Sequence, residues 1–114
     1  MTRKTLDFKL SVLLVREGDL WVAQCLQYDI AAQGKTITEA KHAFCRTVSG
    51  QVCVDLRHHV EPLSGFLPAP RVYWERFMSG ERLADRQPIY IPPDTSMPPA
   101  FMIHAMADDL RIGA

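Results

Sequence analysis

Residues 17–40, EGDLWVAQCLQYDIAAQGKTITEA, contain the signals that decide the fold of this chain. Polar residues at 16–19 form a turn, in which Gly18 is free to adopt a positive φ. Residues 20–26 follow as a strand, and residues 30–33 as a short third strand, before Gly34 and Lys35 end it. The short links predict that successive strands pair in antiparallel order.

The strand expected before this stretch has apolar residues at every second position. This is the period of a strand with one buried face. The alternating residues are Leu6, Phe8, Leu10, Val12 and Leu14.

A helix is expected to begin at Thr36 and to end near residues 56–58. Thr36 and Glu39 have the spacing of a capping box, in which Thr36 accepts from the Glu39 amide and the Glu39 carboxylate reaches back to the Thr36 amide. The helix carries one apolar stripe for packing on the sheet, formed by Ile37, Ala40, Phe44, Val48 and Val52. The predicted fold class is α+β, an antiparallel β-meander with one helix packed on the sheet.

The C-terminal part differs in composition, because seven of the eight prolines lie within 68–99. We expect a short helix over 71–78 with Pro70 in its first turn, an edge strand over 89–91, and a last helix over 100–110. The predicted organisation is an α+β domain over 1–67 and a C-terminal extension over 68–114 with one or two short helices. The extension either folds back over its own sheet or contacts a partner.

Composition limits the function classes. The chain has 114 residues, of which 47% are apolar, with 13 basic and 13 acidic side chains. A net charge of zero argues against a protein that binds nucleic acid mainly through contacts with the phosphates. No apolar run approaches the roughly 20 residues that span a bilayer, and no signal-peptide core follows the basic N-terminus, so a cytoplasmic protein is expected.

Few side chains have the spacing of a catalytic or metal site. His42 and Cys45 are three apart on the predicted helix, but a zinc site needs two further ligands. The adjacent His58 and His59 point about 100° apart on a helix. Cys25 with an unplaced histidine is the one conceivable nucleophile–base pair, and we expect the cysteines to be buried free thiols. We therefore expect no metal and no cofactor.

Acidic residues near the strands permit one enzymatic alternative, a metal-dependent nuclease. These residues are Asp7, Glu17, Asp19 and Asp29. Solvation in turns accounts for three of them, so a binding protein, not an enzyme, is the leading interpretation.

The run WVAQCLQYDIAAQGKTITEA, together with the preceding turn, resembles the HicB-like antitoxin family. That family carries an apolar strand, a tight turn, a Trp-x-Ala run and a Gly-x-Thr/Ser-x-x-Glu-Ala connection into a helix. The resemblance covers about residues 6–60. It implies a β-β-β-α-β, partial RNase H-like domain without nuclease carboxylates, which covers a small HicA-type mRNA interferase toxin.

Family antitoxins often append a DNA-binding domain, whereas this chain has no recognisable one. Prolines in the C-terminal part would break a ribbon-helix-helix or helix-turn-helix, namely Pro88, Pro92, Pro93, Pro98 and Pro99. DNA binding is therefore not expected.

The leading hypothesis is a non-enzymatic antitoxin, and the alternative is an orphan homo-oligomeric module that binds another protein or a small ligand. A meander backed by one helix leaves a sheet edge uncovered, which favours a homodimer or a higher homo-oligomer. Partner contacts are predicted at Trp21, Tyr28 and Asp29 in the sheet and at Tyr73 and Trp74 in the extension. The aromatic residues Phe77, Tyr90 and Phe101 are further interface candidates.

Overall fold

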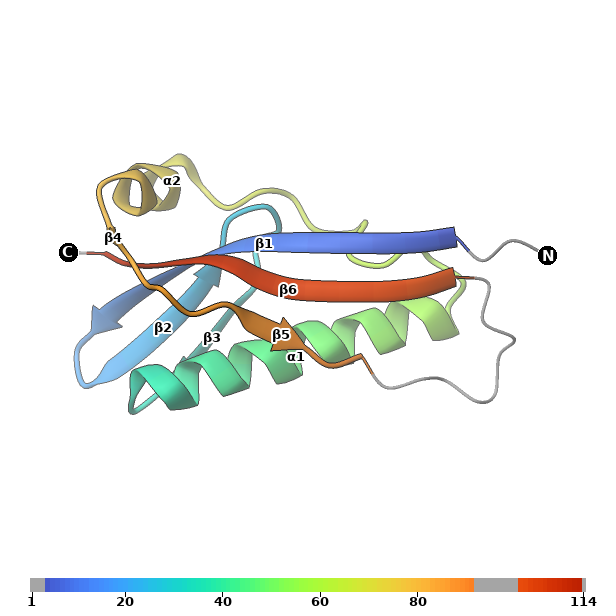
Figure 1. Ribbon diagram of the computed structural model, residues 1–114, viewed down its shortest axis with the longest axis horizontal. Helices are drawn as coiled ribbons and strands as arrows, with labels where there is room; N and C mark the ends of the chain where they lie inside the picture. The colour runs from blue at the N-terminus through green and yellow to red at the C-terminus, as the bar shows by residue number, and fades with distance from the viewer. Residues whose placement is uncertain (1–3, 92–100, 114) are drawn as a thin grey trace.

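β1 (Lys4–Glu17) is the longest strand, and the sheet is built on both of its sides (Figure 1). The computed structural model describes residues 4–91 and 101–113. Within them the sheet has six strands in the order β3-β2-β1-β6-β4, with β5 also paired to β6. The remaining elements are β2 (Leu20–Cys25), β3 (Ala31–Gly34), α1 (Ile37–Arg57), α2 (Arg71–Met78), β4 (Glu81–Arg82), β5 (Gln87–Ile89) and β6 (Phe101–Ile112).

The N-terminal meander confirms the sequence prediction. β1 pairs antiparallel with β2, and β2 pairs antiparallel with β3. Glu17 is opposite Leu20 across a two-residue turn, in which Gly18 has a φ of +61°. Glycine adopts this conformation without steric cost.

The connection from β3 into α1 explains the Gly-Lys-Thr-x-x-Glu-Ala run. Thr36 is the N-cap, and its hydroxyl accepts from the Glu39 amide at 3.1 Å, as predicted. The Glu39 carboxylate accepts from the amide of Lys35 at 2.8 Å, one residue earlier than a capping box predicts. A Cβ on Gly34 would lie 2.6 Å from the Ala40 nitrogen, so β3 approaches the first turn of α1 too closely for any side chain.

The helix predicted over 100–110 is wrong, because residues 101–112 form β6. β6 runs parallel to β1 and pairs with it along most of its length. Ile103, Ala105 and Ala107 alternate with more polar residues, which is the period of a strand and places the apolar side chains on one face. The segment 68–114, expected as an extension, therefore supplies a strand next to β1. The edge strand predicted over 89–91 corresponds to β5, which lies two residues earlier, at Gln87–Ile89, so that only Ile89 belongs to both.

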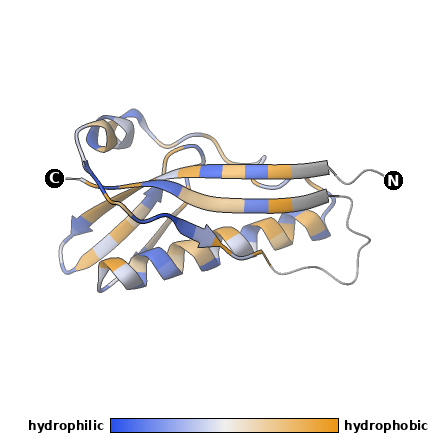
Figure 2. Ribbon diagram, viewed as in Figure 1, coloured by the Kyte–Doolittle hydropathy of each residue, from blue (hydrophilic) through white to orange (hydrophobic). Residues whose placement is uncertain are grey.

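α1 packs on one face of the sheet, as predicted. Its buried residues are Ala40, Phe44, Val48 and Val52. They contact one apolar cluster that includes Leu10, Val12, Leu14, Ala23, Cys25, Ala105, Ala107 and Leu110. Figure 2 shows apolar and polar residues alternating along β1 and β6.

The opposite face carries a second, smaller cluster under α2, the short helix predicted over 71–78. It is formed by Leu13, Val15, Leu26, Ala69 and Phe77, with Val22, Tyr73 and Trp74 packed against it. α2 lies over the β1–β2 end of the sheet (Figure 1) and contacts β1 there.

The segment after α1 closes the α1-side core beyond the end of β2. Leu63 is completely buried in that core although its φ is +65°. The Leu63 amide donates to one carboxylate oxygen of Asp55 at 2.8 Å. The other carboxylate oxygen of Asp55 accepts from the Gln51 side chain at 3.0 Å. Burial of the Leu63 side chain offsets the strain of a left-handed leucine, which costs about 1–2 kcal/mol.

Within residues 4–91 and 101–113, neither helix combines the length and the apolar character needed to cross a membrane.

Candidate binding surface on the open face of the sheet

The sheet face opposite α1 is covered by α2 only at the β1–β2 end. Side chains alternate between the two faces of a strand, so Asp7 and Lys9 of β1 lie on the same face of the sheet as Leu13 and Val15. Both are exposed. They line a groove of about 510 Å³ together with residues of β6 and of the segment around β5.

The floor of this groove is formed by two parallel strands. Asp7 is the register partner of His104, and Lys9 is the register partner of Met106. His104 is exposed, whereas Met106 is half-buried. Pro88, opposite Met106 in β5, and the 75% exposed Tyr90 also line the groove. The surface therefore combines charged groups with a thioether, a proline and an aromatic ring.

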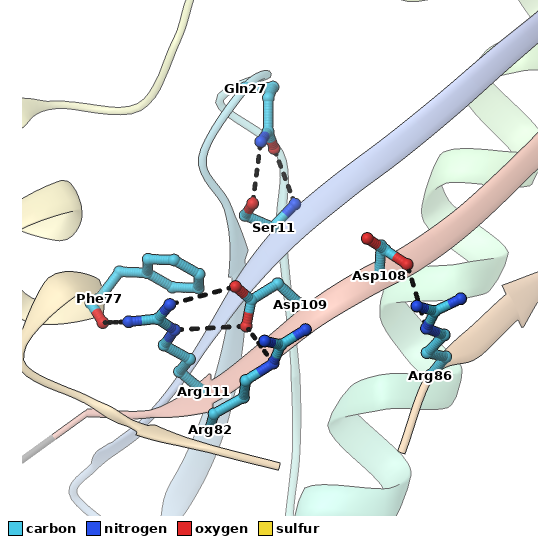
Figure 3. Close-up of polar contacts among 8 residues, drawn as sticks. All are labelled: Ser11, Gln27, Phe77, Arg82, Arg86, Asp108, Asp109 and Arg111. Carbon is cyan, nitrogen blue, oxygen red and sulfur yellow. Dashed lines mark hydrogen bonds and ion pairs between the residues drawn. The ribbon is translucent and has the colours of Figure 1, made fainter. Parts of the chain in front are cut away.

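One margin of the groove contains an ion pair between Arg86 and Asp108. The Arg86 Nε lies 3.3 Å from a carboxylate oxygen of Asp108 (Figure 3). The register between β1 and β6 shifts after Leu10, which is opposite Ala107, because Ser11 is opposite Asp109. Asp108 is thus the extra residue of a β-bulge, a feature that redirects side chains at strand margins.

The adjacent Asp109 belongs to a cluster that fixes α2 to the sheet. Arg111 donates to both carboxylate oxygens of Asp109 at 3.2 and 3.3 Å and to the Phe77 carbonyl at 3.3 Å (Figure 3). The Arg111 guanidinium also lies 4.4 Å from the centre of the Phe77 ring, at cation–π distance. Arg82 approaches the same carboxylate at 3.6 Å. Through the Phe77 carbonyl and ring, the partly buried Arg111 therefore ties α2 to β6.

The Gln27 side chain forms hydrogen bonds with β1 at Ser11, just beyond the last residue of β1 that pairs with β2. The Gln27 carbonyl oxygen accepts from the Ser11 amide at 2.8 Å, and its amide nitrogen donates to the Ser11 hydroxyl at 2.9 Å (Figure 3). Nearby, the buried Gln24 donates to the Asp29 carboxylate at 2.9 Å. The Asp29 amide donates to the Leu67 carbonyl at 2.7 Å. The exposed Asp29, predicted as a partner contact, therefore also holds the loop after β2.

The four aromatic residues predicted as contacts lie on both faces of the sheet. Trp21 and Tyr28 are half-buried against the α1-side cluster, and the Tyr28 and Phe8 rings make a T-shaped contact with 6.1 Å between their centres. Burial raises the pKa of the Tyr28 phenol. Tyr73 and Trp74 pack on the second cluster. The predicted residues therefore do not form one continuous surface.

The thiols are in apolar surroundings. Burial raises the pKa of Cys25 and of Cys45 above the ordinary value of 9.0, so both are protonated at neutral pH. All three cysteines are free. Across the described residues, no three His, Cys, Asp or Glu side chains gather in a way that could hold a metal ion. His42 is exposed on α1, and Cys45 packs against the α1-side cluster.

Sequence reasoning missed the groove because a helix was expected where β6 lies. Read with period two, the residues of β6 separate into an apolar set and a set that contains His104 and Met106. Asp7 and Lys9 alternate in the sequence with Leu6, Phe8 and Leu10, so their position on the solvent-exposed face of the strand could have been predicted. Phe101, Pro92, Pro93, Pro98 and Pro99 lie outside the residues whose side chains the structure describes. Compared with known proteins, the chain matches no protein-family model, no curated protein and no solved structure.

Proposed function

We propose that the chain is a non-enzymatic HicB-like protein that binds and neutralises a small HicA-type mRNA interferase. Two features support the relation. The sheet order β3-β2-β1-β6, with α1 between β3 and β6 in sequence, agrees with the β-β-β-α-β order that the resemblance implies. The residues of the resembling run have defined structural roles, because Gly34 permits the close approach of β3 and Thr36 caps α1.

A binding role rests on the groove over β1, β6 and β5. Charged groups of both signs surround the half-buried Met106, and Tyr90 is exposed beside it. Aromatic residues and methionine are enriched at protein interfaces, and mixed charge on the rim selects a partner by electrostatic complementarity. We therefore propose that the toxin contacts this face.

The test is co-expression of the tagged full chain with the product of the small open reading frame beside its gene. We expect a stoichiometric complex and rescue of growth from the toxin. Met106→Glu introduces a charge on the groove floor and is expected to weaken the complex by at least about tenfold. Val54→Glu is the matched control, because Val54 is 45% exposed on α1, on the other side of the molecule.

Absence of a complex and of rescue would refute the antitoxin role. Equal weakening by Met106→Glu and Val54→Glu would refute the contact of the partner with the groove. Purification of the tagged chain from its native cells distinguishes the antitoxin from the alternative, an orphan homo-oligomeric module. Recovery of the chain alone, as a homo-oligomer, would favour an orphan module with a different ligand.

A further inference from the structure

β1 lacks a strand neighbour on one side over its first half. β2 pairs with β1 only from Val12 to Glu17, whereas β6 pairs with β1 from Lys4 onward. In Figure 1, β1 and β6 extend together beyond β2 and β3. Among the described residues, no strand pairs with the outer edge of residues 4–10. The segment after α1 packs on the α1 side of this stretch through Leu63 and Phe66 but forms no strand pairing with it. An unpaired strand edge of this kind is a template for another strand.

The direction of the main-chain groups on this edge follows from Ser11. Its amide and its carbonyl both point toward the β2 side, because they bond with the Gln27 side chain and with the Leu26 amide. Main-chain groups alternate in direction along a strand. Asp7 and Lys9 therefore present their N–H and C=O groups outward, whereas those of Phe8 and Leu10 point toward β6.

A second copy related by a twofold axis can pair with this edge only in antiparallel order, and the outward residues must oppose one another. With the axis at Phe8, Asp7 of each copy lies opposite Lys9 of the other, and two pairs of opposite charge form. An axis at Asp7 would instead oppose two carboxylates, and an axis at Lys9 two ammonium groups. Opposite charges directly across an antiparallel pair stabilise it, and like charges destabilise it.

The other face of the same register is apolar. The two Phe8 side chains meet at the axis, on the side that packs on α1, and Leu6 lies opposite Leu10 of the second copy, which is already buried in its own chain. Leu6 and Phe8 are only half-buried in the single chain. The Asp7 and Lys9 side chains lie on the opposite face and have no ion-pair partner among the described residues.

We propose that the chain forms a twofold dimer by antiparallel pairing of residues 6–10 of β1, with the axis at Phe8. Two hydrogen-bonded residue pairs contribute about four main-chain hydrogen bonds. The ladder ends at Ser11, whose main-chain groups are already bonded. The sheets of the two copies then become continuous, with both α1 helices on the same side.

Charge exchange tests this register. Asp7→Lys and Lys9→Asp each convert both cross-strand pairs into like-charge pairs. Each variant alone is expected to dissociate roughly 10- to 100-fold more readily than the wild-type dimer in sedimentation velocity. A mixture of the two variants restores opposite charges at both pairs, so a heterodimer should form from chains that are separately monomeric. Glu17→Lys, an equal charge change at the far end of β1, is the control and should leave the dimer intact.

A cross-link tests the axis position independently. A mixture of Asp7→Cys and Lys9→Cys chains should form an intermolecular disulfide between the introduced thiols, located by peptide mass spectrometry, whereas each variant alone should not. A monomeric wild type, a dimer unaffected by the charge changes, or no heterodimer on mixing would overturn the proposal. A disulfide in Asp7→Cys alone would move the axis and overturn the register. The dimer does not depend on toxin binding, because every measurement uses the purified chain.

Discussion

Replacement of Gly34 by alanine should destabilise the fold, because the added methyl group has no space between β3 and α1. The new Cβ would lie 2.6 Å from the Ala40 nitrogen and 2.7 Å from the Glu39 carbonyl carbon. Ordinary contacts begin near 3.4 Å, so the first turn of α1 must move away from β3 by roughly 0.8 Å. Two of the three obstructing atoms are main chain and the third is the Glu39 Cβ, which side-chain rotation does not move, so no rotamer change can relieve the clash.

The expected loss combines two effects. Overpacking costs about 1–3 kcal/mol. Movement of the first turn also weakens the Thr36 cap, which is typically worth about 1 kcal/mol. We therefore expect Gly34→Ala to lower the free energy of unfolding by about 2–4 kcal/mol, measured by urea denaturation with the slope of the transition unchanged.

Gly50→Ala is the matched control, because it adds the same methyl group to a glycine of α1 where, apart from the adjoining backbone of α1, no atom lies within 4 Å of the new Cβ. Alanine in a helix interior is favoured over glycine by about 0.5–1 kcal/mol, so this variant should be more stable than the wild type. The two variants should shift the transition in opposite directions. A Gly34→Ala protein as stable as the wild type would refute the close approach of β3 and α1.

Three further perturbations test other contacts. Gln27→Ala leaves the Ser11 amide without its acceptor and should cost about 1–3 kcal/mol of stability in urea denaturation; an unchanged midpoint would contradict the role of Gln27 as a substitute for β2. Asp55→Ala removes the acceptor of the strained Leu63 amide and should cost about 1–3 kcal/mol, with faster hydrogen exchange in residues 59–67 as the second readout. Because burial raises the pKa of Cys25, its contribution to stability is present below pH 9.0 and is lost as the pH rises through the raised pKa. Thermal unfolding between pH 7 and 11 should therefore show a smaller alkaline loss in Cys25→Ala, and identical pH profiles would contradict this assignment.

The N-terminal half of the fold could be predicted because its signals are local. The alternation along β1, the turn at Gly18 and the cap at Thr36 each depend on residues that are close in sequence. The apolar stripe of α1 similarly identifies its own buried face. The prediction of an α+β meander therefore followed from neighbouring residues alone.

The position of β6 could not be predicted in the same way, because its pairing with β1 joins segments about 100 residues apart. Alanine at 105 and 107 favours a helix by intrinsic propensity, and the alternation in this segment competes with that preference. Packing decides between them, since Ala105 and Ala107 are buried in the α1-side cluster when this segment is a strand beside β1. The predicted contacts Tyr73 and Trp74 illustrate the same difficulty, because interface and core aromatics have the same sequence pattern.

The unequal lengths of the strands account for both surfaces to which we assign binding. β1 has 14 residues and β6 has 12, whereas β2 has six and β3 has four. The longer pair therefore extends past the meander and exposes an edge and one face. At the edge of β1 the Gln27 side chain takes the place of β2 beside Ser11, and on the α1 side Leu63 fills the core. On the face that carries Asp7 and Lys9, α2 covers only the β1–β2 end of the sheet. The first half of β1 is left to line the groove, and a sheet that its own chain covers fully on one face and only partly on the other leaves a surface suited to a partner.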